Sequence, residues 1–179
     1  MWVAVVVASL VGVRAAAAQT GWQGEPLEPP PAARYGDAGT NHVGLALGLG
    51  GGSGGFAWAA GAEYGRFVID GVAPTAEVDV SGGTRLATIA STMLALRLLP
   101  FRRGPIWPLL VPRAGRLFVA DRDDLWGAGA TLGIVIALGG RIGLQVAYDH
   151  LWLFPKAGCS AFSSGCTWQR WGLGLVVGL

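Results

Sequence analysis

Two histidines and a group of three serines are the residues whose chemistry could support acyl transfer. His42 and His150 are the histidines, and Ser160, Ser163 and Ser164 follow shortly after His150. A serine nucleophile needs a base within hydrogen-bond reach and a third group that orients this base. Nothing in the spacing of these five residues enforces that geometry. We therefore expect no catalytic residues, and an acyl enzyme remains an alternative.

Two other stretches have compositions that bind ions or phosphate in other proteins. The acidic "DRDD" (121–124) could offer carboxylates to Ca²⁺, but it lacks the central glycine and the distant glutamate of a calcium loop. The glycine-rich "LGLGGGSGG" (47–55) is followed neither by GK[ST] nor by a helical pattern. We therefore expect no metal and no cofactor. The first stretch is predicted to be a solvated or cation-bridging loop, and the second a hairpin turn.

The two cysteines, Cys159 and Cys166, enclose a segment of six residues. In an exported protein such a pair forms a disulfide that closes a small loop. Metal binding is the weaker alternative, because the loop contains no histidine and two thiolates do not complete a tetrahedral zinc site. We predict a disulfide between Cys159 and Cys166.

Eight segments with alternating apolar and small or polar residues must position these side chains. In "RIGLQVAYDHLWLF", for example, Ile142, Leu144 and Val146 share one face, and Gly143 and Gln145 lie on the other. Alternation at period two predicts β-strands, and Gly, Asp and Pro between the segments predict turns. The predicted strands are 42–50, 56–64, 72–80, 85–99, 106–120, 126–138, 141–154 and 168–179.

The composition indicates which face of these strands meets lipid. Hydrophobic residues make up 52% of the 179 residues and charged residues only 13%, whereas soluble domains carry about 25% charged residues. After the N-terminus, no run of about 20 apolar residues could form a transmembrane helix. The polar faces hold small residues and single charges, as expected in the narrow lumen of an eight-stranded barrel. The prediction is all-β: an eight-stranded antiparallel transmembrane up-and-down β-barrel. A soluble sandwich or lipocalin-like barrel is the alternative.

This orientation of the strands predicts a role for two sets of side chains. Unpaired charges inside a barrel are costly, so the charges on the polar faces predict an ion-pair network in the lumen. Its members are Glu63, Glu77, Asp79, Arg85, Arg97, Arg141, Asp149 and Arg170. Aromatic residues near strand ends predict a girdle at the lipid interface. Its members are Trp58, Tyr64, Tyr148, Trp152 and Trp171. Arg113 and Arg116 have opposite parity in the fifth strand, which predicts a bulge between them.

The chain resembles the small outer-membrane β-barrels of the OmpX/OmpW-like type. Segments such as "GAEYGRFVIDGVAPTAEVDV" and "GAGATLGIVIALGGRIGLQVAYDHLW" are similar to their strand–short turn–strand hairpins, and the resemblance covers residues 41–179. It implies a bacterial outer-membrane barrel with both barrel termini in the periplasm. The implied partners are outer-membrane lipid, lipopolysaccharide and the barrel assembly machinery. Family members usually end in an aromatic residue, whereas this chain ends in Leu179, which puts the strength of recognition by that machinery in doubt.

The segment before the strands and the overall charge complete the expectations. Residues 1–18 have the apolar core and small-residue end of a signal peptide, with an anchor helix as the alternative. The Pro-rich residues 19–40 predict an extended periplasmic lead-in. A net charge of +2 does not favour nucleic acid, and we expect a monomer.

Three functions are compatible with these features. Because the predicted outer loops are mostly short, a non-enzymatic structural or surface-binding role is favoured. A narrow conduit or binding cup for small apolar molecules is the first alternative, and a lipid-modifying acyl enzyme is the second.

Overall fold

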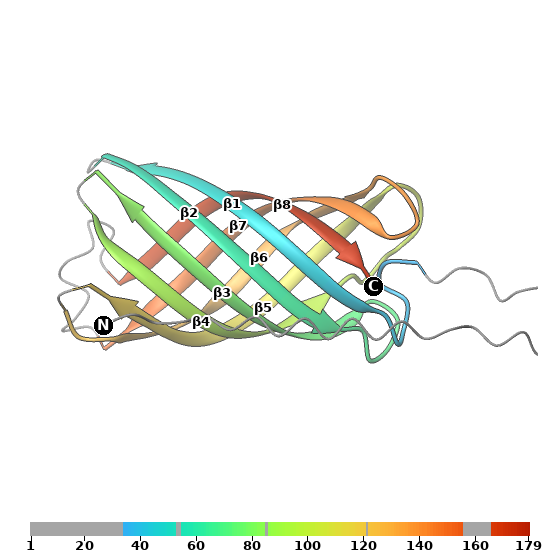
Figure 1. The fold of residues 1–179 in the computed structure, drawn as a ribbon, viewed down its shortest axis with the longest axis horizontal. Coiled ribbons are helices and arrows are strands. Elements are labelled where there is room, and N and C mark those ends of the chain that lie inside the picture. Colours follow the sequence, from blue (N-terminus) through green and yellow to red (C-terminus); the bar gives the residue numbers. More distant parts are fainter. Residues whose placement is uncertain (1–33, 53–54, 85, 121, 156–165) are drawn as a thin grey trace, which may run out of the picture. The chain divides into compact units, whose positions relative to one another are not determined.

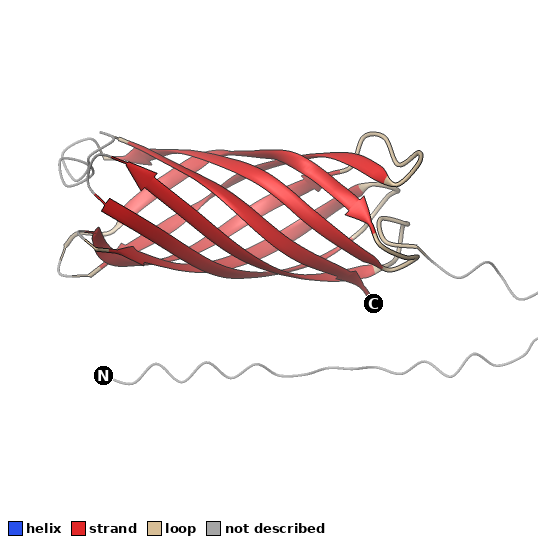
Figure 2. Ribbon diagram, turned by 90° about the horizontal axis from the view of Figure 1, so that it is seen from above, coloured by secondary structure: helices blue, strands red, loops and turns tan. Residues whose placement is uncertain are grey.

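Eight strands form the folded part of the chain. The computed structural model describes residues 34–52, 55–84, 86–120, 122–155 and 166–179, all within one compact unit, Ala32–Leu179. The strands are β1 (Asn41–Gly52), β2 (Gly55–Arg66), β3 (Val72–Gly83), β4 (Leu86–Leu98), β5 (Ile106–Val119), β6 (Leu125–Ala137), β7 (Ile142–Phe154) and β8 (Thr167–Gly178). All regular structure among the described residues is strand (Figure 2). That part of the chain contains no helix long and apolar enough to cross a membrane.

Antiparallel pairing between sequence neighbours closes the strands into a barrel (Figure 1). The closing pair is β1 with β8, whose register runs from His42↔Gly178 to Leu49↔Trp171. Because the number of strands is even, β1 begins and β8 ends at the same end of the barrel, which we call the terminal end. The turns 67–71, 99–105 and 138–141 also lie there, and the opposite end is called the loop end. The predicted eight-stranded antiparallel up-and-down barrel is confirmed.

The alternation of side chains divides each strand between the outside and the lumen. In β7, Ile142 and Trp152 are exposed on the outer face, whereas Ala147 and Asp149 are buried inside. Glycines on the lumen side leave room for charged groups. A Cβ at Gly44, for example, would overlap the side chain of Glu63. The small residues of the polar faces therefore make space for the long charged side chains opposite them.

Strand β5 contains no bulge, so the bulge expected within it is wrong. Its pairing with β6 is continuous from Ile106↔Ile136 to Leu117↔Leu125, and exposure alternates along its whole length. Arg113 and Arg116 therefore simply point to opposite faces, the first into the lumen and the second outward. The register shift in this region of the sheet lies instead between β3 and β4, at Ser81 and Gly83.

Residues 34–40 form turns against the terminal end of the barrel. The amide of Tyr35 donates a hydrogen bond to the carbonyl of Gly140 at 2.8 Å. Gly36 and Gly39 have φ angles of 91° and 85°, a conformation that glycine adopts without steric cost. The described part of the predicted lead-in is therefore bent and attached to the barrel, not extended. The predicted signal peptide, residues 1–18, lies outside the described residues.

Candidate functional site

Ion pairs in the middle of the lumen link strands that are distant in sequence. Arg113 lies between two carboxylates, with its Nη1 at 2.9 Å from Glu77 Oε2 and its Nη2 at 2.7 Å from Asp149 Oδ1. Arg170 joins the same cluster: its Nε lies 2.5 Å from Asp149 Oδ2, and its Nη2 lies 2.8 Å from Asp79 Oδ1. Strands β3, β5, β7 and β8 are thus connected across the lumen through charged side chains.

A second part of this network surrounds Arg97. This side chain is fully buried, pairs with Glu63, and donates from Nη1 to Gln145 Oε1 at 2.9 Å. The Asp149 carboxylate also accepts a hydrogen bond from the Thr131 hydroxyl at 2.6 Å. In the described lumen the network contains three arginines and four carboxylates, so each carboxylate has at least one cationic partner.

The structure brings six of the eight predicted network residues together. The six are Glu63, Glu77, Asp79, Arg97, Asp149 and Arg170. Arg141 is exposed in the turn before β7, and its place in the network stays a prediction. Arg85 lies outside the described residues. The sequence analysis did not include Arg113 in the network. Its position in the alternation of β5, in step with the inward-facing residues, could have indicated this role.

An apolar cluster, called the terminal cluster, fills the lumen at the terminal end. Its buried members are Tyr35, Phe67, Ala73, Leu99, Trp107, Leu109, Val111, Val135 and Val176. The ring of Tyr35 stacks on Trp107 with 6.4 Å between centroids and meets Phe67 edge-on at 5.3 Å. Burial raises the pKa of Tyr35 to about 12. The turn at 34–40 therefore places the ring of Tyr35 inside the barrel, and we call this side chain the stopper.

Charged side chains hold this turn in place. Asp37 Oδ1 lies 2.7 Å from Arg102 Nη1, and Asp70 Oδ2 lies 3.2 Å from Arg102 Nη2. Partial burial would raise the pKa of Asp37, but the amide of Arg34 and the guanidinium of Arg102 outweigh it, and the pKa is lowered. The ionised carboxylate of Asp37 is therefore the form that holds the stopper in place.

The space left in the lumen is small. A second apolar cluster packs toward the loop end, formed by Ile89, Met93, Leu117, Val119, Leu125, Leu151 and Leu153. Between the charged network and the small residues of β1, β2 and β8 lies a cavity of about 50 Å³, which has room for only a few water molecules. Small-molecule pockets are several times larger, about 300–1,000 Å³. The lumen is therefore packed, with a charged middle between two apolar clusters.

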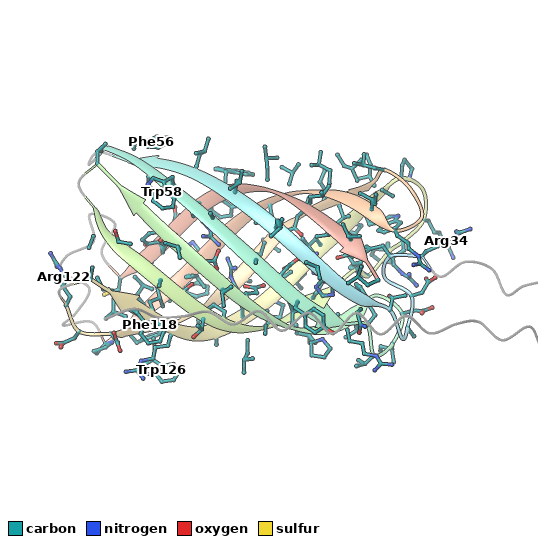
Figure 3. All side chains as sticks on the ribbon, viewed as in Figure 1. Arg34, Phe56, Trp58, Phe118, Arg122 and Trp126 are labelled. Atoms are coloured by element: carbon teal, nitrogen blue, oxygen red, sulfur yellow. The ribbon has the colours of Figure 1, made fainter. Side chains whose placement is uncertain are left out.

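The outer face is mostly apolar, and the polar residues Arg116, His150 and Gln169 on it lie toward the loop end. Leu45, Leu47, Leu94, Leu132 and Leu173 are each more than half exposed on it. Figure 3 labels Phe56, Trp58, Phe118 and Trp126 near the loop end, and all four side chains are exposed. This arrangement inverts that of a soluble protein, because the charges are inside and the leucines are outside. Such an inversion is typical of barrels that face lipid.

Comparison with known proteins agrees with this geometry. Neither protein-family models nor curated proteins give a match. Among solved structures, Neisserial surface protein A is similar with a TM-score of 0.57 and 11% identity, over 77% of this chain and 95% of that chain. The outer membrane protein OprG from Pseudomonas aeruginosa aligns with a TM-score of 0.46 and 15% identity, over 82% of this chain and 99% of that chain. The fold is that of the small eight-stranded outer-membrane barrels.

The predicted girdle residues all lie on the outer face of this outer-membrane-type barrel. Trp58 and Trp152 are near the loop end, and Tyr64 is near the terminal end. Tyr148 and Trp171 contact each other from neighbouring strands, with ring centroids 5.1 Å apart. Their placement in a lipid interface remains a prediction.

The two histidines considered for acyl transfer lie in different parts of the barrel. His42 is fully buried at the terminal end, beside Tyr35 and Phe67. His150 lies on the outer face, 4.6 Å from the ring of Trp152. The three candidate serines at 160–164 lie outside the described residues. The described part of the barrel therefore shows no pair of nucleophile and base.

The remaining candidate sites fall mainly in connections at the loop end. Cys159 lies outside the described residues, so its pairing with the half-buried Cys166 stays a prediction. In the acidic stretch, Asp121 is also outside them, and Asp124 Oδ2 lies 2.7 Å from Arg116 Nη2. Within the described ranges, no three His, Cys, Asp or Glu residues are grouped as metal ligands.

Proposed function

We propose that this chain is an integral protein of the bacterial outer membrane with a non-enzymatic, structural or surface-binding role. The observation that carries the proposal is the inverted polarity of the barrel, with ion pairs inside and exposed leucines outside. In water this outer face would leave a large apolar surface unprotected. In a bilayer, a closed barrel satisfies its backbone hydrogen bonds and places its apolar side chains in lipid.

The filled lumen favours a structural role over transport. A channel for ions or solutes needs an open path, and eight strands enclose only enough space for side chains to fill. Here the network and the terminal cluster occupy that space. A binding cup for a small apolar molecule is disfavoured, because the cavity is too small and is lined by Arg97, Arg113 and Arg170. An acyl enzyme stays the second alternative, because its candidate serines lie outside the described residues.

The same proposal includes a location, a processing step and partners. Residues 1–18 would act as a signal peptide, and both barrel termini would face the periplasm. The barrel would be a monomer in contact with outer-membrane lipid and lipopolysaccharide after insertion by the barrel assembly machinery. A disulfide between Cys159 and Cys166 would form in this oxidising compartment.

A heat-modifiability gel on the outer-membrane fraction tests the proposal. We expect the unboiled protein to migrate differently from the boiled protein, because a folded barrel remains closed in detergent. Recovery of the protein in the soluble periplasmic fraction, with no shift on boiling, would overturn the proposal.

A matched pair of substitutions tests the outer face directly. Leu47 lies midway along β1 and is 67% exposed, whereas Leu138 is similarly exposed in a turn at the terminal end. Arginine at the centre of a lipid-facing strand costs about 2–4 kcal/mol, and much less near the interface. We expect Leu47→Arg to reduce the folded fraction in the membrane strongly and Leu138→Arg to leave it unchanged. Equal tolerance of both variants would indicate that the outer face meets water.

A further inference from the structure

Charge is distributed unequally between the two ends of the barrel. The charged residues described at the terminal end are Arg34, Asp37, Arg66, Asp70, Arg102, Arg103 and Arg141, which are five arginines and two aspartates. Those described at the loop end are Arg116, Arg122, Asp123 and Asp124, which balance one another. Figure 3 labels Arg34 and Arg122 at these opposite ends. The described part of the terminal end is therefore strongly basic.

Only part of this positive charge is used within the protein. Arg102 forms ion pairs with both Asp37 and Asp70 while it holds the stopper. Arg66 and Arg103 are exposed, and neither forms an ion pair within the described residues. They lie on different elements, at the end of β2 and in the turn between β4 and β5. Their guanidinium groups are thus available to an anion outside the barrel.

Apolar side chains are exposed on the same turns as these arginines. Val68, Ile69, Phe101 and Leu138 are each more than half exposed, and they belong to all three turns of the terminal end. Apolar groups beside arginines suit the boundary between acyl chains and headgroups, because the apolar groups contact the acyl chains and the arginines contact the headgroups. Trp107, the tryptophan described at this end, faces the lumen. The exposed tryptophans Trp58, Trp126 and Trp152 lie near the loop end instead.

We propose that the rim of the terminal end binds the phosphate groups of anionic phospholipids in the surrounding leaflet, through Arg66 and Arg103. This inference rests on the proposed membrane insertion and adds the class of lipid recognised. Arginine matches phosphate well because its planar guanidinium offers several N–H donors in one plane. A lipid shell surrounds the barrel and reaches arginines on separate elements, whereas a protein partner would meet a patch on one side. The distribution around the rim therefore favours lipid.

Native mass spectrometry of the full chain, folded in detergent, tests this inference. The protein is mixed with equal amounts of phosphatidylglycerol and phosphatidylethanolamine, and the ratio of the two retained lipids is measured. We expect the wild type to prefer phosphatidylglycerol. The double variant Arg66→Gln/Arg103→Gln should lower the ratio by about fivefold for each arginine removed. Arg122→Gln at the loop end is the matched control and should leave the ratio unchanged.

The outcomes separate this inference from the proposed function. A folded wild type without preference, or a preference unchanged in the double variant, would overturn the anionic-lipid site alone. A protein that does not fold into lipid vesicles at all would instead overturn the proposed membrane barrel. Lipid A is included as a competing probe, because it also carries phosphate. If lipid A binding, and not phosphatidylglycerol binding, depends on Arg66 and Arg103, the assignment to phospholipid is wrong. A boiling-dependent gel shift verifies that the variants are folded.

Discussion

At the scale of single residues, Arg113 is a central link of the lumen. It is the cationic partner of Glu77 and shares Asp149 with Arg170. Removing one partner of a buried ion pair leaves uncompensated charge and costs about 3–5 kcal/mol. We therefore expect Arg113→Met to lower the free energy of unfolding by about this amount. The measurement is urea unfolding in lipid vesicles, followed by tryptophan fluorescence.

Arg116 offers a matched control on the same strand. It points outward, its side chain is half exposed, and it pairs with Asp124 near the loop end. Exposed ion pairs contribute about 0–1 kcal/mol, so Arg116→Met should have little effect. Similar losses for the two variants would contradict the view that the inward face holds the dominant charge network.

Asp37 gives a pH dependence at the same scale. Its pKa is lowered in the folded state, in spite of partial burial, by the amide of Arg34 and the guanidinium of Arg102. A carboxyl group with a lowered folded pKa adds stability above its unfolded pKa of about 3.9, and this stability is lost as the pH falls through the folded pKa. Asp37→Asn should therefore lower the urea midpoint at pH 7, and the difference should vanish in stronger acid.

Asp123→Asn is the control for this titration, because Asp123 is exposed and forms no ion pair within the described residues. We expect it to match the wild type at every pH. A destabilisation by Asp37→Asn that persists unchanged to pH 3 would indicate that its effect does not come from the ionised carboxylate.

At the scale of elements, the ladder between β4 and β5 is interrupted. No residue pair lies between Ala95↔Arg113 and Leu98↔Leu110, and Pro112 occupies the interval. The pairing of Pro112 with Ala130 on the other side is continuous. Because proline lacks the N–H that a ladder needs, the missing donor falls on the β4 side. We expect Pro112→Ala to supply it and to slow hydrogen exchange in residues 94–98.

Residues 130–134 of β6 are the internal reference for this experiment, because they pair with the same part of β5 across an intact ladder. Their exchange should not change in Pro112→Ala. Equal exchange of 94–98 in the two proteins would show that the gap in register comes from another cause than the proline.

The elements also show how far local pattern could predict this molecule. The alternating pattern predicts the seventh strand at 141–154, close to the observed Ile142–Phe154, because alternation depends only on neighbouring residues. Arg141 has lumen parity in that pattern, but its strand begins one residue later at the rim, which parity alone does not reveal. The turn at 34–40 depends on contacts with Gly140 and Phe67. Such contacts between distant parts of the chain leave no local periodic signal.

At the scale of the whole molecule, two successive barriers cross the lumen. The terminal cluster, with Tyr35 inserted, fills one end, and the ion-pair network spans the middle. The barriers differ in chemistry, because the first excludes water by apolar packing and the second fills the space with paired charges. Each therefore obstructs the path independently of the other.

This arrangement predicts the electrical behaviour of the barrel in a planar lipid bilayer. We expect no conductance steps from the wild type, because both barriers are in place. Tyr35→Ala should also remain non-conducting, since removing the stopper leaves Arg97, Arg113 and Arg170 paired across the lumen. A wide porin inserted in the same bilayer is the positive control. Steps from the wild type would favour the conduit alternative, and steps from Tyr35→Ala alone would mean that the network does not block ions.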